Sequence, residues 1–196
     1  ILRMHYSNEV TTRMAWESLA VFKGFHQAVG SPSGYVQTGY ALIAGEGDRA
    51  PMEENVAMQR GAGVRTSVVS REEMKELAPA LLIRPEETCA YEPDSGYADP
   101  HLVTQGYARR ARELGATVEV ETPAATIDVE GGKVNGVTTT AERISTPVAV
   151  VAAGPWAGRL LGRVGFDLPL ATVRHQVIVL GTRNGEGQRR PVIGDL

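Results

Sequence analysis

The stretch Val150-Val151-Ala152-Ala153-Gly154-Pro155-Trp156-Ala157 says more about the fold class than any other part of the chain. The apolar, β-branched run from Val148 to Val151 predicts a buried strand, and small residues follow it. Small residues let the backbone approach a flat ligand closely. Pro155 suits the first turn of a helix, whose free N–H groups can face that ligand. The same pattern is also typical of any strand-to-helix connection in an α/β domain, so both interpretations stay open here.

The composition is that of an ordinary globular protein. The chain has 196 residues, of which 42% are hydrophobic and 22% charged, and its formal net charge is −3. This charge gives no sign of the basic surface typical of proteins that bind nucleic acid or anionic membranes. The apolar runs are far shorter than the ~18 residues that span a bilayer, and no secretory signal is recognisable. We therefore expect no nucleic-acid partner and no membrane span.

The cysteine and histidine content limits the chemistry further. The single cysteine, Cys89, excludes an internal disulfide framework and favours a reducing, cytoplasmic location. It has no basic neighbour in sequence and is expected to be a small buried hydrophobic residue. The four histidines are scattered without metal-ligand spacing, so we predict no metal site. The chain starts at Ile1 and ends without a closing helix, which predicts that it is a piece of a longer protein.

Capping signals predict the helices. Asn8 can cap a helix from about Glu9 to Val29, whose apolar stripe includes Val10 and Met14 and indicates packing against a sheet. Further helices are expected over Pro51 to Arg60, after the capping box Ser70-Arg71-Glu72-Glu73, and from Asp99-Pro100 to Leu114.

Apolar runs between turn signals predict the strands, and Gly131-Gly132 predicts the turn of a β-hairpin. The expected strands are Tyr35 to Ala44, Thr117 to Glu121, Ala125 to Val129, Lys133 to Thr140, Arg143 to Ala152 and Leu168 to Gly181. The change at Asp99 from scattered strands to a helix followed by a meander predicts a fold in two parts. One part is a mixed sheet that contains the first and last of these strands and packs against the helix from Glu9 to Val29.

The order of these motifs resembles the D-amino-acid oxidase superfamily of FAD-dependent oxidoreductases. The resemblance rests on Ser95-Gly96-Tyr97-Ala98-Asp99-Pro100, the helix and meander after it, Ala152-Ala153-Gly154-Pro155-Trp156, and Val173-Arg174-His175-Gln176. Leu2-Arg3-Met4-His5-Tyr6 is similar to the segment just after the family's Gly-Ser-Ser turn. The chain is most similar to the branch of sarcosine, dimethylglycine and glycine oxidases or dehydrogenases.

The resemblance implies a mixed α/β (α+β) fold. Residues 1–98, with the helix at 9–29, are expected to form mainly a substrate domain with a mixed sheet. Residues 99–165 are expected to form a helix and a three-stranded β-meander of an incomplete FAD-binding domain, and residues 166–196 to return to the substrate-domain sheet.

The family's Gly-x-Gly-x-x-Gly turn, which brings backbone to the pyrophosphate, does not occur here. The nearest match, Gly45-Glu46-Gly47-Asp48, has Ala50 where the third glycine belongs, and we interpret it as a turn. The chain thus resembles an internal fragment that lacks the dinucleotide-binding motif and the C-terminal part of the family. We expect it to hold no tightly bound FAD by itself.

The resemblance also implies site residues. Arg3 matches the position whose guanidinium holds a substrate carboxylate, which suits its planar fork of donors, although a solvated terminal arginine is the alternative. His175 is a candidate general base or flavin neighbour, although a lone histidine in a strand is often structural. His5, beside Arg3, is interpreted as a polar residue after a strand, and the alternative is a residue near the flavin.

The cofactor candidates lie in the second half of the chain. Ala124 matches the residue whose backbone faces the adenine of FAD, and Ala153, Gly154 and Trp156 match residues beside the flavin. An ordinary strand start and a core aromatic are the alternatives for Ala124 and Trp156.

The implied function is that of a fragment of an FAD-dependent oxidoreductase that oxidises the C–N bond of a small amino acid or N-methylated amino acid. The cofactor takes a hydride equivalent from the substrate and leaves an imine that hydrolyses. The expected partner is a small amine or amino acid, the fragment alone is expected to be inactive, and the oligomeric state stays open. The alternatives are a non-catalytic fragment or binding module, and a flavoenzyme of this fold that acts on a hydroxy acid or glycerol phosphate.

Overall fold

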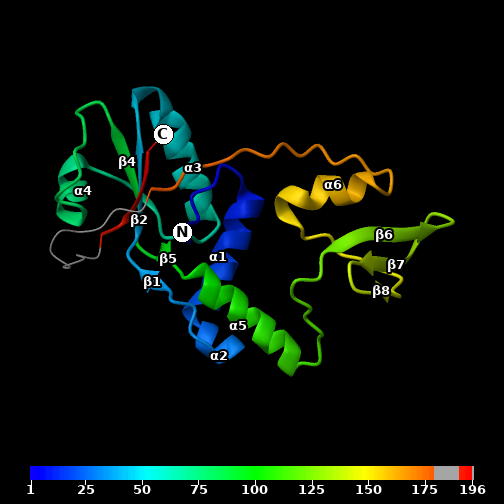
Figure 1. The fold of residues 1–196 in the computed structure, drawn as a ribbon. Coiled ribbons are helices and arrows are strands. Elements are labelled where there is room, and N and C mark those ends of the chain that lie inside the picture. Colours follow the sequence, from blue (N-terminus) through cyan, green and yellow to red (C-terminus); the bar gives the residue numbers. More distant parts are fainter. Residues whose placement is uncertain (179–189, 196) are drawn as a thin grey trace. The chain divides into compact units, whose positions relative to one another are not determined.

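The computed structural model describes residues 1–178 and 190–195, and Figure 1 shows their elements. The chain divides into two compact units. The first unit comprises residues 1–117 and the C-terminal segment from residue 184, and the second comprises residues 118–183. No helix of the described residues is long and apolar enough to cross a membrane.

A four-stranded mixed sheet forms the centre of the first unit (Figure 1). Its strands lie in the order β3 (Ser67–Val69), β4 (Thr88–Glu92), β2 (Tyr40–Ala44) and β9 (Val192–Asp195). Strand β2 pairs antiparallel with β4 and parallel with β9. All five residues of β2 are buried, because helices cover both faces of the sheet at this strand.

Alternate residues of β2 point to opposite faces of the sheet and contact different helices. On one face, Tyr40 and Leu42 pack in a cluster with Met52 and Val56 of α3 (Arg49–Gly61). On the other face, a second cluster joins Ala41, Ile43, Ile83 and Cys89 to Met74 of α4 (Arg71–Leu77). Cys89 is buried, as expected, and burial raises the pKa of its thiol. The capping box at Ser70 and Glu73 that begins α4 is also confirmed.

Two expectations for this sheet are wrong. The predicted strand Tyr35 to Ala44 is interrupted at Gly39, and its first part, β1 (Val36–Gln37), pairs with β5 (Gly96–Tyr97) in a separate two-stranded sheet. The predicted strand Leu168 to Gly181 does not form over residues 168–178, and residues 179–181 lie outside the described part of the chain. Strand β9 pairs with β2 at the edge of the sheet, in place of the predicted strand Leu168 to Gly181.

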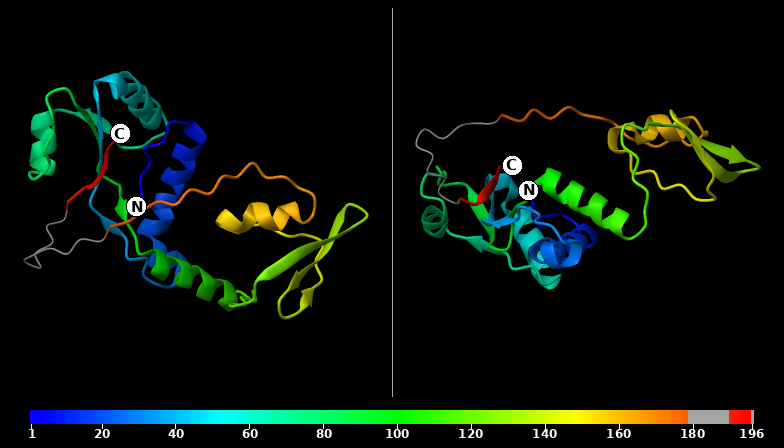
Figure 2. Two further views of the ribbon diagram at one scale, coloured as in Figure 1. Left: turned by 45° about the horizontal axis from the view of Figure 1, so that its top comes forward. Right: turned by 60° about the horizontal axis from the view of Figure 1, so that its bottom comes forward.

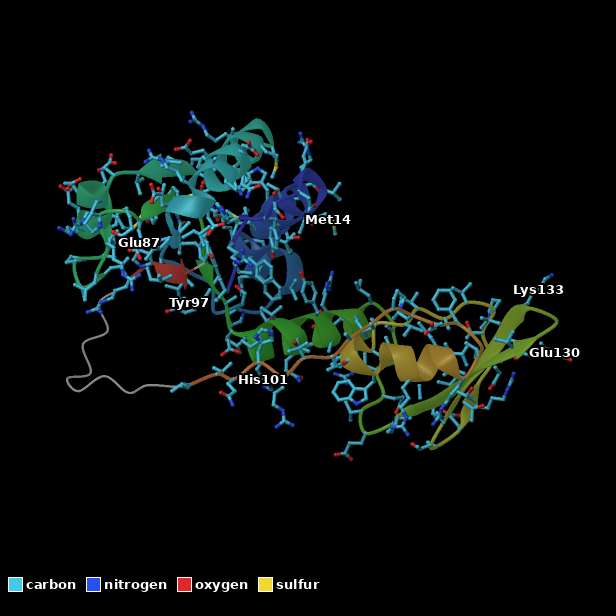
Figure 3. The ribbon with its side chains drawn as sticks, turned by 90° about the horizontal axis from the view of Figure 1, so that it is seen from above. Met14, Glu87, Tyr97, His101, Glu130 and Lys133 are labelled. Carbon is cyan, nitrogen blue, oxygen red and sulfur yellow. The ribbon has the colours of Figure 1, made fainter. Side chains whose placement is uncertain are left out.

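The predicted helix Glu9 to Val29 is two helices, α1 (Glu9–Lys23) and α2 (Phe25–Val29), which meet at Gly24. Asn8 caps α1 as expected, since its side chain accepts a hydrogen bond from the backbone N–H of Thr11. The expected packing of the apolar stripe against a sheet is wrong: Met14 is 64% exposed, and Figure 3 shows its side chain pointing away from the unit. Helix α1 buries Leu19 instead, in a small cluster with Met4 and Val64.

Helix α5 (Pro100–Glu113) begins as predicted at Asp99, whose carboxylate accepts hydrogen bonds from the two backbone N–H groups after Pro100. It packs on α2 through an edge-to-face contact between Phe25 and Tyr107, with ring centroids 5.1 Å apart. The segment Gly45-Glu46-Gly47-Asp48 is a turn, as interpreted, because residues 46–48 form a short 3-10 helix, η1 (Glu46–Asp48).

A three-stranded antiparallel meander dominates the second unit: β6 (Ala124–Glu130), β7 (Lys133–Thr139) and β8 (Arg143–Ile144). The predicted hairpin is confirmed, and Glu130 and Lys133 lie at its tip (Figure 3). After the meander, η2 (Gly154–Trp156) leads into α6 (Ala157–Gly162), which lies alongside β6 (Figure 2). The short helical start at Pro155 agrees with the predicted strand-to-helix connection, except that the strand before it is absent.

Of the predicted strands in this unit, one does not form and another is much shorter than expected. Residues 117–121 contain no strand, and the predicted strand Arg143 to Ala152 ends at Ile144. The apolar run that follows is exposed, with Val148 at 69% and Val150 at 89%. A strand needs a neighbour to satisfy its backbone groups, and none pairs with residues 148–152 in the described part of the chain. β-Propensity alone therefore does not make this segment a strand.

Candidate substrate and cofactor sites

Arg3 is held in a defined position in the first unit. Its guanidinium carbon lies 5.0 Å from the ring centroid of Tyr6 and 5.6 Å from that of Tyr40, distances at which a cation is attracted to an aromatic ring. Its Nη1 also donates a hydrogen bond of 2.7 Å to the backbone carbonyl of His5. Arg3 is also half-buried. Its burial and these contacts both argue against a freely solvated terminal arginine.

A pocket of about 460 Å³ opens beside Arg3. Its polar lining includes Arg3, His5, Tyr6, Tyr40, Asp48 and Asn55. Burial raises the pKa of the Tyr40 hydroxyl, and the positive charge of Arg3 opposes this shift. The Tyr40 hydroxyl lies so close to Gly194 that a Cβ there would clash with it. The pocket thus brings the guanidinium of Arg3 together with hydrogen-bonding groups and one acidic side chain, Asp48, and Arg3 is the lining group suited to a small carboxylate.

A buried carboxylate, Glu92, supports the segment that carries Arg3. Glu92 ends β4, is 1% exposed, and accepts hydrogen bonds from the backbone N–H of Met4 at 3.0 Å and from Ser95 Oγ at 2.8 Å. The Nδ1 atom of His5 lies 3.6 Å from Glu92 Oε1. Sequence reasoning missed Glu92, because its only signal is an acidic residue at the end of an apolar strand.

A hollow of about 830 Å³ in the second unit brings all four predicted cofactor residues together. Ala124 lies at the start of β6, and Ala153, Gly154 and Trp156 lie at and within η2. The volume falls within the range of about 300–1,000 Å³ that is usual for small-molecule sites. Most of the lining residues are small or apolar, and Trp156 is 69% exposed. The lining thus offers backbone and a flat aromatic surface, which fits the planar rings of a flavin nucleotide.

Two arginines that sequence reasoning missed also line this hollow. Arg159 lies on α6, and Arg163 lies just after it and donates a hydrogen bond to the backbone carbonyl of Ala125. Their spacing of four residues places them on one side of a helical turn, and this spacing was the only sequence signal. Guanidinium groups complement the phosphates of a nucleotide, so their presence agrees with a cofactor of this class.

His175 is the remaining residue that the sequence predicts to belong to the site. It belongs to the second unit, is exposed, and lies in a segment of residues 168–178 that forms no strand. It is not among the residues that line either hollow described above. Its role as a general base or flavin neighbour therefore stays a prediction. No group of three or more histidine, cysteine or acidic side chains among the described residues is arranged to hold a metal ion.

Known proteins are similar to this chain in sequence and in fold. The family model described as FAD dependent oxidoreductase matches residues 1–195. The chain is 28% identical to D-amino acid dehydrogenase of Bradyrhizobium diazoefficiens over 144 residues, which cover 72% of this chain and 34% of that protein. It is 29% identical to human mitochondrial sarcosine dehydrogenase over 182 residues, which cover 89% of this chain and 20% of that protein.

A solved structure agrees with these sequence matches. L-Proline dehydrogenase from P. horikoshii superposes with a TM-score of 0.77 at 27% identity, over 84% of this chain and 44% of that one. The chain therefore spans between a fifth and about two fifths of the length of these three proteins. The match over residues 1–195 shows the family directly: this chain belongs to the FAD dependent oxidoreductases of the DAO family.

Proposed function

We propose that this chain is part of an enzyme that oxidises the C–N bond of a small amino acid or N-methylated amino acid. The observation that carries the proposal is Arg3, which the two tyrosine rings and the His5 carbonyl hold beside a small polar pocket. The names of the relatives support the substrate class, since they refer to D-amino acids, sarcosine and L-proline. All of these substrates carry a carboxylate that a guanidinium can bind.

We assign the two parts of the enzyme as follows. The first unit, with Arg3, supplies most of the substrate domain. The second unit supplies part of the FAD-binding domain, in which Ala124, Ala153, Gly154 and Trp156 hold the cofactor mainly through backbone and ring contacts. The apolar run at residues 148–152, in which Val148 and Val150 are exposed, supports this assignment, because buried strands of a sheet have this composition. The single buried Cys89 favours a reducing, cytoplasmic location.

The residues of this chain bind and orient the substrate. When bound, FAD accepts a hydride equivalent from the carbon of the C–N bond, and the imine that results is hydrolysed. Arg3 holds the substrate carboxylate, which fixes which carbon is presented for oxidation. The Tyr40 hydroxyl is protonated at neutral pH, and burial raises its pKa further, so it can donate a hydrogen bond.

The cofactor part of the proposal is tested by filling the hollow. In the full-length protein, Ala153→Leu places a larger side chain among the lining residues and should weaken FAD binding by about tenfold or more. Lys133→Ala at the exposed hairpin tip lies outside the hollow and serves as the matched control. FAD binding is followed by the flavin absorbance that remains after gel filtration. Equal flavin content in both variants would contradict the assignment.

The substrate part is tested with a panel of amines. The full-length protein should reduce its flavin with N-methylated or free amino acids and not with 2-hydroxy acids or glycerol phosphate. A 2-hydroxy acid carries the same carboxylate for Arg3, so this panel separates the amine function from the hydroxy-acid alternative. Turnover of the hydroxy acid alone would replace the proposed function, and no turnover together with no flavin would favour a binding module.

A further inference from the structure

Glu92 is a buried carboxylate that no step of the proposed reaction uses. It contacts residues 3–5, which we call the Arg3 segment. Glu92 is 1% exposed, and its Oε2 accepts hydrogen bonds from Met4 N–H and Ser95 Oγ. Met4 is the residue between Arg3 and His5, and 88 positions in the sequence separate it from Glu92. The carboxylate therefore fixes the backbone of the Arg3 segment to the end of β4.

His5 is the second contact between Glu92 and this segment. Its side chain is 7% exposed, and its Nδ1 lies 3.6 Å from Glu92 Oε1. Within the described residues, neither of these two atoms has a hydrogen-bond partner. The carbonyl of the same residue accepts the 2.7 Å hydrogen bond from Arg3 Nη1. Glu92 thus faces the side chain of the residue whose backbone oxygen orients the guanidinium.

Burying the Glu92 carboxylate costs free energy, so the groups that bind it indicate what it does. A buried carboxylate needs oriented donors to offset the loss of water, and an apolar side chain of similar size would fill the space at a lower cost in free energy. The donors that Glu92 does have belong to Met4, in the Arg3 segment, and to Ser95, which lies three residues further along the chain. These contacts are consistent with a role in fixing the geometry of residues 3–5.

We propose that Glu92 is a positioning residue for Arg3, which acts through Met4 and His5 to hold the guanidinium in the orientation that receives the substrate carboxylate. The inference rests on the proposed function, since it assumes that Arg3 binds the carboxylate. Glu92 does not touch the substrate. Its removal should therefore weaken recognition of the carboxylate and leave the cofactor and the chemical step unchanged.

The test compares two substrates in the full-length protein: an N-methyl amino acid that it oxidises, and the primary amide of that amino acid. The amide keeps the size of the substrate and removes its negative charge. Glu92→Gln should raise KM for the acid by about fivefold, a size usual for residues that share one hydrogen-bond network. The KM for the amide, both kcat values and the flavin absorbance should stay unchanged. An equal change for acid and amide would overturn the proposal, because a general structural defect gives that result.

Asp94→Asn is the matched control. Asp94 lies two residues beyond Glu92 and is 3% exposed, and its carboxylate binds Lys23 and Arg65 instead of the Arg3 segment. The control removes a buried negative charge two residues beyond the end of β4. It should lower the melting temperature and leave both KM values unchanged. A selective rise in KM for the acid in this control would also count against Glu92 as the specific link.

Arg3→Lys and the double variant separate the proposal from the function on which it rests. If Arg3→Lys leaves KM for the acid unchanged, the carboxylate-binding role of Arg3 is wrong. If Arg3→Lys raises this KM and Glu92→Gln does not, only the positioning role is wrong. If both roles hold, the double variant should raise KM no more than about twofold beyond Arg3→Lys alone, because both changes affect one interaction.

Ser95→Ala keeps the proposal testable if Glu92→Gln does not fold. It removes one donor to Glu92 Oε2 and leaves the carboxylate and its bond to Met4 in place. It should raise KM for the acid by about twofold and leave KM for the amide unchanged. If Ser95→Ala changed KM by the same factor for the acid and for the amide, the positioning role would be overturned.

Discussion

The guanidinium of Arg65 binds the carboxylate of Asp94 through two hydrogen bonds, from Nε to Oδ2 at 2.5 Å and from Nη2 to Oδ1 at 2.7 Å. The Nζ atom of Lys23 adds a third, of 2.7 Å, to Oδ1. These bonds link the end of α1 and the segment before β3 to the loop after β4. They lower the pKa of Asp94 from its ordinary 3.8 to about 2, and burial opposes the shift.

This pKa predicts how stability depends on pH. Because the folded state lowers the pKa of Asp94, its contribution to stability is fully present above about pH 4 and is lost as the pH falls towards 2. The shift corresponds to at most about 2.5 kcal/mol, and to less in practice because Arg65 is 65% exposed. Asp94→Asn should therefore lower the melting temperature at pH 6 and reduce the further loss between pH 4 and pH 2. Glu54→Gln, a change at an exposed residue, should match the unmodified protein at each pH.

The interruption of the first predicted strand should be intolerant of substitution. Gly39 has a φ of 79°, and a Cβ there would lie 2.6 Å from Cε2 of Tyr91. Gly39→Ala combines left-handed backbone strain with overpacking, and should destabilise the first unit by about 2–4 kcal/mol. Gly47→Ala is the control, because a Cβ at that position meets no atom within 4 Å. Melting temperatures of the two variants check this prediction, and equal values would refute it.

The tyrosine rings around Arg3 should contribute to substrate binding. Tyr40→Leu removes the ring and its attraction for the guanidinium, and should raise KM for carboxylated amines by an amount that corresponds to about 0.5–1 kcal/mol. Tyr40→Phe keeps the ring and removes only the hydroxyl, so its KM should rise less. Steady-state kinetics of the full-length variants would decide the matter. A larger effect from Tyr40→Phe than from Tyr40→Leu would show that the hydroxyl, and not the ring, is the important group.

The 196-residue chain by itself should not retain FAD. No Gly-x-Gly-x-x-Gly turn occurs in it, and this turn typically supplies the donors for the pyrophosphate. Without those charge-assisted bonds, of about 1.5–3 kcal/mol each, affinity should fall by several orders of magnitude. The chain would be incubated with FAD and passed through gel filtration, with the full-length protein as the positive control. A yellow fraction with stoichiometric flavin would contradict the prediction.

Local signals in the sequence predicted the elements that depend on near neighbours. Asn8, Ser70 with Glu73, and Asp99 each cap a helix through backbone groups two or three residues away, so these starts could be located without a structure. The turn at Gly131-Gly132 likewise joins strands that are adjacent in the sequence. For the same reason the small-residue stretch before Trp156 could be located as a connection into a helix.

The candidate sites divide in the same way. The resemblance located Arg3 and the four cofactor residues, and the fold places those four around one hollow. Glu92 and Arg163 could not be found from the sequence, because the groups that they bind lie 88 and 38 positions away along the chain. His175 lies in a segment that forms no strand over residues 168–178, and its role stays a prediction.

The sequence by itself thus determined the helix starts, the hairpin and the family, all of which are expressed in short patterns and their order. Only the tertiary structure decided which apolar runs become strands. Residues 40–44 form a strand because β4 and β9 satisfy their backbone groups, whereas residues 148–152 have equal propensity and gain no such partner within the described chain. A helix satisfies its own hydrogen bonds, but a strand depends on residues that the chain brings from elsewhere.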